Sequence, residues 1–275
     1  MEAGDVEPAD AVLQAAFGRM ESSARDLKRY LAVQPDGWLL AEMGGSVVGM
    51  VGAVDYGDYA YIGYMAVLPE FQGQGIGRAL LRKLLGWLDE RGCRMTVLDA
   101  TDRGAPLYVN EGFDVEGGTI VYVQTQPGQK HFPSRMVRPV TVADIPQLVA
   151  FDRPVFGADR ERVFRVLLAD FPERVFKTQS DDGHLTGFVF AHPIRIGPFV
   201  ACNQQAARDL FQAALSLEYE GNIRMIAPNE NLHAADLYGE FGFEPRLPHR
   251  HMRRGGFSIP GRRDLVYAQT GFTIG

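Results

Sequence analysis

The sequence predicts an α/β protein with a mixed sheet, in which one fold of strands and helices occurs twice. Residues 60–91 read as a strand, a glycine-rich loop and a helix in direct succession. A shift of 130 residues lays part of the first half over the second without a gap. Each half also contains a hairpin-like stretch, at 38–49 and at 175–187, with Gly-Gly or Asp-Gly at its turn. A chain of 275 residues is long enough for two such domains.

The strand and helix of residues 60–91 follow from their apolar patterns. The stretch Tyr61–Val67 is apolar and rich in aromatic and β-branched residues, as a buried strand is. Pro69 has no N–H group and should end that strand. Gly92 stands where a helix C-cap glycine belongs. Between them, one helical face collects the apolar residues Ile76, Leu80, Leu81, Leu84, Leu85 and Leu88.

The loop between this strand and helix has the character of a phosphate site. Gly73, Gly75 and Gly77 leave backbone N–H groups uncovered at the positive end of the helix, where phosphate oxygens bind well. The loop has no Gly-Lys-Ser/Thr, so it is not a Walker A loop. Its glycine spacing also departs from the dinucleotide fingerprint Gly-x-Gly-x-x-Gly.

The spacing that fits is Gln/Arg-x-x-Gly-x-Gly, met by Gln72, Gly75 and Gly77. With the Val-x-Pro-Glu strand end before it and the segment 107–113 (Leu-Tyr, then Gly-Phe) after it, this motif resembles the GNAT superfamily of acyl-CoA-dependent N-acetyltransferases. The resemblance covers residues 5–124 with specific motifs. It implies tandem GNAT folds, each a twisted, mostly antiparallel sheet flanked by helices, with acetyl-CoA as co-substrate and no metal.

The resemblance also implies which residues bind the cofactor. The backbone of the strand should hold the pantetheine arm and polarise the thioester carbonyl, at Met65, Ala66 and Val67, although a plain core strand would read the same. The loop and first helical turn should hold the pyrophosphate. Arg78 is equally well explained as a surface arginine, because the second copy keeps an arginine at that place. The implied loop ligands are Gln72, Gly73, Gln74, Gly75, Ile76, Gly77 and Arg78.

Acyl transfer needs an acid for the thiolate and a route for the proton of the amine. Tyr108 matches the tyrosine that often protonates the departing coenzyme A thiolate in this family, and a phenol can donate to a thiolate. The same tyrosine recurs as Tyr238 in the second copy, so packing is an alternative role. The general base stays open among four candidates: Glu42, Asp55, Tyr64 and Asp99.

The second copy keeps the scaffold and loses the glycines. Residues 93–114 lie over 223–244, and the identical pairs include Arg94 with Arg224 and Tyr108 with Tyr238. Over the glycine loop lies Cys-Asn-Gln-Gln-Ala-Ala, at 202–207, whose side chains would crowd a pyrophosphate. We therefore expect a degenerate GNAT-like domain that does not bind acyl-CoA in the same way.

The domain boundaries follow from the repeat. An acyl-CoA-binding domain should span 1–124 and the degenerate domain 136–254, joined by a linker rich in Gln, Pro and Gly at 124–134. The second copy should open with a strand at 136–140, whereas the first starts almost at its helix. The remaining tail, 255–275, contains an apparent strand at 264–270, which we expect to pair with a sheet edge of the first domain or of a partner chain.

Composition sets the remaining bounds. Apolar residues make up 46% and charged residues 23%, which is ordinary for a globular protein, and no apolar run is long enough to span a bilayer. The acidic start is unlike a signal peptide, and two cysteines without a metal or redox spacing favour a cytoplasmic setting. A net charge of −6 argues against nucleic acid as a partner. The run His249-Arg250-His251 offers no third metal ligand.

The resemblance to the GNAT superfamily implies an N-acetyltransferase that moves an acetyl group from acetyl-CoA directly to the amine of a small molecule or an amino-acid-like substrate. Two alternatives stay open. The chain is either a non-catalytic acyl-CoA-binding sensor or scaffold, or a transferase for another acyl group or an oxygen acceptor. No membrane and no nucleic acid are expected as partners, and homodimerisation is left open.

Overall fold

The computed structural model describes residues 1–275 except 19, 127–133 and 257–260. The chain forms two compact units, and each contains the expected mixture of helices and mixed sheet. Unit 1 comprises Met1–Val115, Met252–Phe257 and Phe272–Gly275. Unit 2 comprises Glu116–His251 and Ser258–Gly271. The α/β class predicted from the sequence is confirmed.

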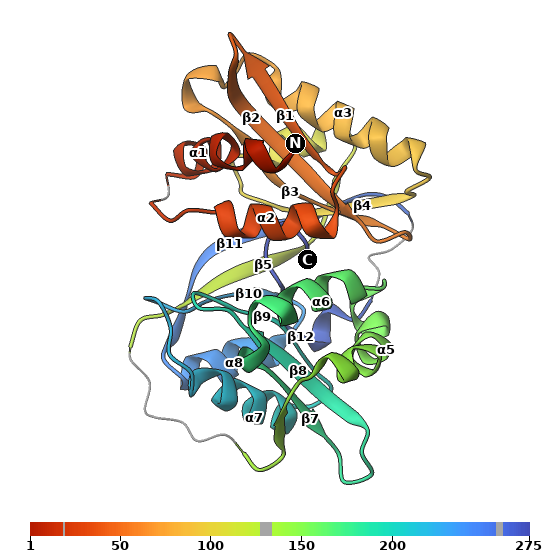
Figure 1. Cartoon of the computed structure of the whole chain (residues 1–275), viewed down its shortest axis with the longest axis vertical. Coiled ribbons are helices and arrows are strands. Elements are labelled where there is room, and N and C mark those ends of the chain that lie inside the picture. Colours follow the sequence, from red (N-terminus) through yellow and green to blue (C-terminus); the bar gives the residue numbers. More distant parts are fainter. Residues whose placement is uncertain (19, 127–133, 257–260) are drawn as a thin grey trace. The chain divides into compact units, whose positions relative to one another are not determined.

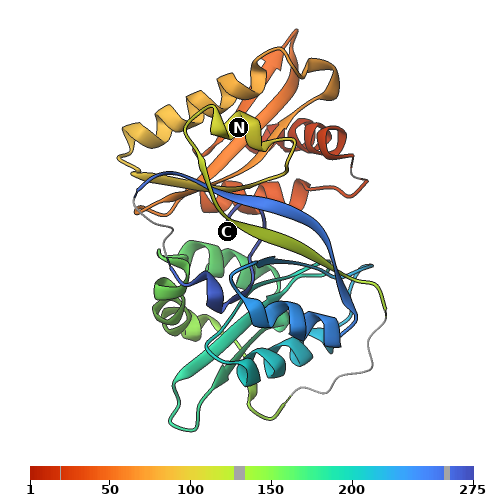
Figure 2. The same ribbon diagram turned by 180° about the vertical axis from the view of Figure 1, so that it is seen from behind.

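Unit 1 is a sheet with helices on both faces. Its strands run in the order β1-β2-β3-β4 and then the end of β11. Helices α1 and α2 cover one face and α3 the other, as the two opposite views show (Figures 1 and 2). Its elements are α1 Val6–Phe17, α2 Ala24–Val33, β1 Trp38–Met43, β2 Ser46–Asp55, β3 Ala60–Val67, α3 Ile76–Glu90, β4 Met95–Ala100, α4 Ala105–Val109 and the start of β5 Asp114–Gln124.

The local predictions for unit 1 hold. A short 3-10 helix at Ala3–Asp5, and no strand, precedes α1, and β1 and β2 form a hairpin whose turn glycines, Gly44 and Gly45, both have positive φ. The leucines of α3 are buried against β2 and β3, as their one-sided spacing predicts. On the opposite face the ring of Trp38 is only 1% exposed and lies over Gly52. A Cβ at Gly52 would lie 1.9 Å from Trp38 Cε3, so this packing requires glycine.

Unit 2 repeats this plan with a separate five-stranded sheet, ordered β12-β9-β8-β7-β6, and the strands β11-β5-β10. Its core is rich in aromatic side chains, with Phe211 and Tyr238 at a ring distance of 5.3 Å. Its elements are β6 Val137–Pro139, α5 Ile145–Phe156, α6 Glu161–Asp170, β7 Val175–Gln179, β8 Leu185–Ala191, β9 Ile196–Ala201, α7 Gln204–Leu215, β10 Arg224–Pro228, α8 Leu232–Glu240, β11 Phe243–Gly255 and β12 Val266–Ala268.

The units do not divide where the repeat suggested. The last strand of the first copy, β5, belongs mostly to unit 2, where it pairs antiparallel with β10 from Arg224↔Val123 to Pro228↔Thr119. The end of β11, the last strand of the second copy, belongs to unit 1. Each unit therefore contains a strand from the other copy, and the division between the compact units falls within β5, whereas the repeat-based bounds 1–124 and 136–254 stay a prediction. Most of the predicted linker lies outside the described residues.

The C-terminal segment forms a sheet-edge strand, as expected, but in unit 2. The sequence suggested that 264–270 pairs with an edge of the first domain or of a partner chain, but β12 pairs antiparallel with β9 in unit 2, with Val266 opposite Val200 and Ala268 opposite Phe199. The strand forms there because β9 offers an unpaired edge on the side away from β8. Of the residues that follow β12, Phe272–Gly275 belong to unit 1.

Candidate acetyl-CoA site

The strand that leads into the glycine loop separates from its parallel neighbour. The antiparallel register of β3 with β2 continues to Val67, opposite Gly49. The parallel register of β3 with β4 covers only Ala60 and Tyr61. Beyond Tyr61 the β4-facing edge of β3 is therefore released from the ladder, and we call the region between the two diverging strands the slot. The three residues predicted to bind pantetheine, Met65–Val67, lie in this released part.

A bulge marks the start of the divergence. The register of β3 shifts between Gly63 and Ala66, and Tyr64 adopts φ +52°, a value that residues other than glycine rarely take. The Tyr64 ring packs against Tyr30 and Trp38, with centroid distances of 5.7 and 6.3 Å. The bulge turns Met65 and Val67 toward the core under α3. Backbone strain of this kind gathers at functional sites, where the surrounding packing maintains it.

The loop at the end of β3 has the geometry that a phosphate site needs. Gly73 and Gly75 have φ of +76° and +85°, and a Cβ at either would meet open space within 4 Å. Gly75 is the N-cap of α3, and no side chain caps the helix. Within the described chain, the N–H groups of residues 73–78 have no protein acceptor. These donors are therefore exposed at the positive end of a 15-residue helix.

Gln72 stabilises the loop through hydrogen bonds of its side chain and its backbone N–H. Its Nε2 donates to the Val67 carbonyl at 2.9 Å, and its Oε1 accepts from Arg103 Nη2 at 2.7 Å. Its own N–H donates to the Pro69 carbonyl at 3.3 Å. The polar groups of Gln72 therefore shape the loop, which gives this motif position a structural reason. Arg103 was missed by sequence reasoning, since nothing in its spacing marks it.

Arg78 is tied to a carboxylate. Its Nε lies 3.6 Å from Glu111 Oε1, and Arg82 Nε lies 2.9 Å from the other oxygen of Glu111. The hydrogen bond from Arg82 lowers the pKa of Glu111. In unit 2 the matching Arg208 forms the same kind of pair with Glu240, at 2.8 Å. A pair that recurs in both units favours a structural role for the Arg78 side chain, while its backbone N–H remains part of the loop.

The two matching tyrosines differ in what their hydroxyls do. Tyr108, on α4, is 7% exposed and its ring meets Phe113 edge-on at 5.7 Å. Its hydroxyl forms no hydrogen bond with any described residue. Burial raises the pKa of Tyr108 above the ordinary value of 10, so the phenol stays protonated. Tyr238 is fully buried and donates to the Tyr267 carbonyl. Packing therefore explains Tyr238, whereas the Tyr108 hydroxyl is available.

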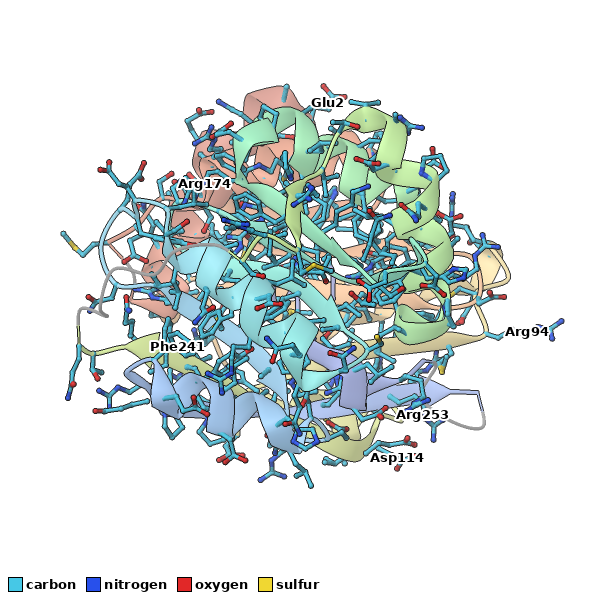
Figure 3. The ribbon with its side chains drawn as sticks, turned by 90° about the horizontal axis from the view of Figure 1, so that it is seen from below. Glu2, Arg94, Asp114, Arg174, Phe241 and Arg253 are labelled. Carbon is cyan, nitrogen blue, oxygen red and sulfur yellow. The ribbon has the colours of Figure 1, made fainter. Side chains whose placement is uncertain are left out.

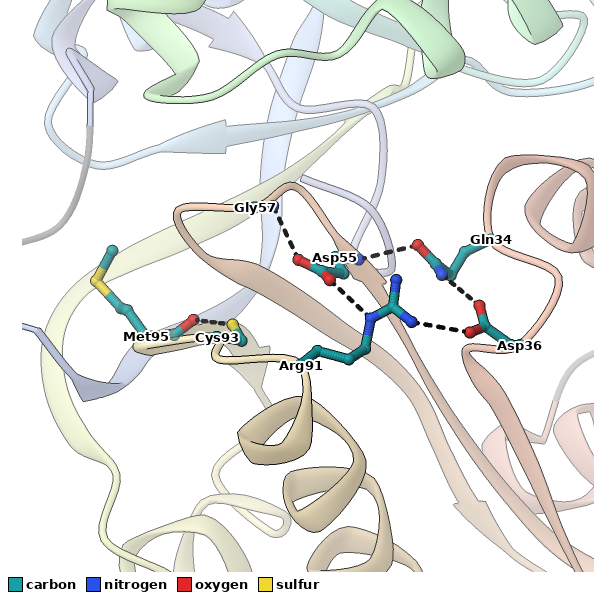
Figure 4. A network of polar contacts seen from close by, with 7 residues as sticks. All are labelled: Gln34, Asp36, Asp55, Gly57, Arg91, Cys93 and Met95. Carbon is teal, nitrogen blue, oxygen red and sulfur yellow. Dashed lines mark hydrogen bonds and ion pairs between the residues drawn. The ribbon is translucent and has the colours of Figure 1, made fainter.

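The structure separates the four candidate bases. Asp55 accepts from the Gly57 N–H and from Arg91 Nε, at 2.8 and 2.9 Å, near the end of α3 remote from the loop (Figure 4). Glu42 is exposed on the edge strand β1, and Tyr64 is held in the aromatic cluster. Asp99 Oδ2 accepts from the Tyr61 hydroxyl, at the position where β3 leaves β4. Asp99 is thus the carboxylate that the fold places at the slot.

The C-terminal residues Phe272–Gly275 pack against unit 1 at β3 and at the loop that follows β2. Thr273 packs against the strand at Gly63, where a Cβ would lie 2.3 Å from Thr273 Cα. The Tyr56 hydroxyl donates to the Ile274 carbonyl at 2.7 Å, and Ile274 is fully buried. Sequence reasoning missed these contacts, because they join residues more than 200 positions apart.

A cleft of about 440 Å³ lies elsewhere in unit 1, lined by residues that include Asp89, Cys93, Arg94, Thr96 and Arg254. It borders the start of β4, whereas the glycine loop follows the end of β3. Arg94 extends away from the ribbon (Figure 3). This cleft is therefore not the slot. Among the described residues, no group of three His, Cys, Asp or Glu is arranged to hold a metal ion, and no helix is long and apolar enough to cross a bilayer.

Comparison with known proteins gives matches along both halves. The acetyltransferase (GNAT) family model matches residues 10–113, and an acetyltransferase (GNAT) domain model matches residues 148–268. The N-acetyltransferase YitH of Bacillus subtilis (strain 168), itself uncharacterised, is 26% identical over 205 residues, which span 72% of this chain and 71% of YitH. Acetyltransferase plu1384 of Photorhabdus laumondii is 36% identical over 92 residues, 33% of this chain; the match spans 64% of that relative, less than two thirds.

Solved structures agree with this assignment. A candidate acetyltransferase from Pyrococcus horikoshii superposes with a TM-score of 0.88 at 26% identity, covering 100% of this chain and 94% of that one. A tandem GNAT protein from the clavulanic acid biosynthesis pathway has a TM-score of 0.60 at 16% identity, covering 94% and 98%, and so shows the shared fold alone. The two family models together account for most of the chain. The chain therefore consists of two GNAT domains in tandem and belongs to the GNAT family of acetyltransferases.

Proposed function

We propose that this acetyltransferase moves an acetyl group from acetyl-CoA directly to the amine of a small molecule or an amino-acid-like substrate, and that unit 1 carries out the transfer. One observation carries the proposal. Unit 1 combines a strand that separates from its neighbour at Tyr61 with a helix N-terminus whose glycines leave N–H donors exposed. Unit 2 has side chains at all the glycine positions of the loop.

The cofactor is held by backbone groups. The N–H groups of residues 73–78 bind the pyrophosphate oxygens, and the pantetheine arm lies along Met65–Val67 on the released edge of β3. Gln72 keeps the loop and the strand end in register through its bond to Val67. In this proposal the thioester of bound acetyl-CoA would lie along the released edge of β3, and Tyr108 is the residue assigned to its sulfur. Fixing both reactants in this way removes much of the entropic barrier to the reaction.

In the transfer, the amine nitrogen attacks the thioester carbonyl carbon and the carbon–sulfur bond breaks. The departing thiolate accepts a hydrogen bond from the hydroxyl of Tyr108, which burial keeps protonated, and the phenol proton that moves to sulfur is replaced from solvent. The proton of the amine leaves through Asp99, directly or through water, since this carboxylate stands where the slot opens. The free thiols of Cys93 and Cys202 are in keeping with a reducing, cytoplasmic setting.

The test is thiol release from acetyl-CoA across a panel of primary amines. Tyr108→Phe should lower turnover at least about tenfold, or roughly 1.4 kcal/mol, with acetyl-CoA affinity unchanged. Tyr238→Phe is the matched control, because it removes the equivalent hydroxyl in unit 2, and turnover should persist. Full turnover in Tyr108→Phe would remove this tyrosine from the mechanism. Binding of acetyl-CoA without thiol release for any amine would favour the sensor function instead.

A further inference from the structure

Unit 2 has a slot in the place that corresponds to the slot of unit 1. The strands β9 and β10 flank α7 in the chain as β3 and β4 flank α3. Arg195, which directly precedes β9, forms a parallel bridge with Arg224 of β10, much as β3 and β4 pair at Ala60↔Thr96 and Tyr61↔Val97. Beyond the bridge, β9 and β10 belong to different sheets, so they have separated in the same manner.

In unit 2 this slot is filled by the chain itself. The strand β12 pairs antiparallel with β9 along one edge. On the other edge, the Gln269 N–H donates to the Ile226 carbonyl of β10 at 2.8 Å. The segment Val266–Gln269 thus connects the two separated strands through backbone hydrogen bonds, and the two-sided pairing resembles that of an added strand.

Side chains of unit 2 also donate hydrogen bonds to the segment. Asn231 Nδ2 donates to the Val266 carbonyl at 3.1 Å, and the Tyr238 hydroxyl donates to the Tyr267 carbonyl. At the far end, Arg160 Nη1 donates to the Thr270 hydroxyl at 3.3 Å. Arg160 is itself fixed by an ion pair with Asp152 at 2.6 Å, and both side chains are at most 3% exposed. Together these side-chain donors form a binding site for an extended polypeptide segment.

The segment is buried as deeply as the core. Tyr267 is 3% exposed, and its ring lies 5.1 Å from that of Phe199 on β9. Ala268 and Thr270 are fully buried. Gly197 lets the segment approach closely, because a Cβ there would lie 2.0 Å from the Gln269 carbonyl oxygen.

We propose that unit 2 is a peptide-binding module, whose slot holds an extended polypeptide where the slot of unit 1 holds the acetyl-CoA of the proposed function. Its resident ligand is the chain's own segment Val266–Thr270. A peptide brings no pyrophosphate, so the loop at 202–207 needs no glycine, and a tyrosine without a thiolate to protonate can bind a carbonyl instead. The segment also excludes a second acetyl-CoA from this unit.

Hydrogen exchange measured on the full chain tests this directly. Asn231→Asp keeps the oxygen that caps α8 by accepting from the Ala234 N–H, and replaces the donor to Val266 with an acceptor. Combined with Tyr238→Phe, it removes two donors to the segment while retaining the side-chain volume. Asn203→Asp is the matched control, because Asn203 caps α7 in the same unit without touching the segment.

In the wild type, the amides of residues 266–269 should exchange as slowly as those of β9, and in the double variant at least about tenfold faster. The control should exchange like the wild type. Rapid exchange of these amides in the wild type, or no difference between the double variant and the control, overturns the proposal. The measurement needs no acetyl-CoA, so its result is independent of catalysis in unit 1.

A second experiment asks whether the slot accepts a peptide in trans. Ala268→Glu with Gln269→Pro should expel the resident segment, because it buries a charge and removes the N–H that bonds Ile226. A fluorescent peptide with the sequence of residues 264–271 should then bind this variant and fail to bind the wild type. Absence of binding to a folded variant whose tail exchanges rapidly, or equal binding of a scrambled peptide, contradicts a peptide-binding slot.

Discussion

The exposed glycine at the start of α3 gives the sharpest test of the cofactor site. Gly75→Glu places a carboxylate where the pyrophosphate should bind, in open space with no protein atom within 4 Å of the new Cβ. The substitution also strains the backbone, because φ is +85° at this residue. A residue with a Cβ in this conformation costs about 1–2 kcal/mol of stability. Strain and blockage must therefore be separated.

Gly57 provides the control within the same unit. It has φ +91°, an equally open surrounding, and an N–H that donates to Asp55 at 2.8 Å. Gly57→Glu should therefore suffer similar backbone strain without approaching the loop. Gly75→Gln adds a third comparison, since it has the bulk of glutamate without its charge. Thermal unfolding of the three variants should show similar losses of stability.

The affinity for acetyl-CoA should differ between the variants. Two like charges 4 Å apart repel by about 4 kcal/mol at an effective dielectric constant of 20, and solvent at the exposed loop reduces this. We expect Gly75→Glu to weaken binding at least about 100-fold, or roughly 2.7 kcal/mol, with Gly75→Gln intermediate and Gly57→Glu near wild type. Isothermal titration calorimetry measures all four proteins. Equal dissociation constants for Gly75→Glu and Gly57→Glu would refute the assignment of the loop.

The remaining predictions concern packing, charge and pH. Gly52→Ala should lower the free energy of unfolding by about 1–3 kcal/mol, because its Cβ would enter the ring of the buried tryptophan of β1. Gly86→Ala, on α3, should raise the free energy of unfolding by about 0.5–1 kcal/mol, because alanine favours the helix. Urea titration compares the two variants, and equal effects would contradict this packing. Asp152→Ala should cost about 3–5 kcal/mol in the same assay, because buried Arg160 loses its carboxylate, and a loss below about 1 kcal/mol would show that the pair is not buried in solution. Because the pKa of Tyr108 is raised, turnover should show no loss from ionisation of this phenol up to about pH 10; a fall near pH 9 that disappears in Tyr108→Phe would count against it.

The sequence alone predicted what depends on neighbouring residues. The leucine spacing of α3, the turn glycines at 44 and 45, and the strand at 137–139 all appear as expected, since helix periodicity and turn chemistry act over a few residues. The glycine spacing was sufficient to predict the family, which the two matching family models confirm. The repeat at a shift of 130 residues likewise predicted two related domains.

Only the tertiary structure decided how distant segments combine. The placement of β5 in unit 2, of the end of β11 in unit 1, and of β12 beside β9 depends on strand pairing between residues far apart in the chain, which leaves no periodic signal. The two tyrosines show the same division. Tyr108 and Tyr238 are equivalent in the sequence repeat, and their hydroxyls differ because one backbone carbonyl, at Tyr267, reaches Tyr238 alone. Local patterns determine which elements form, while long-range pairing determines which groups remain free to react.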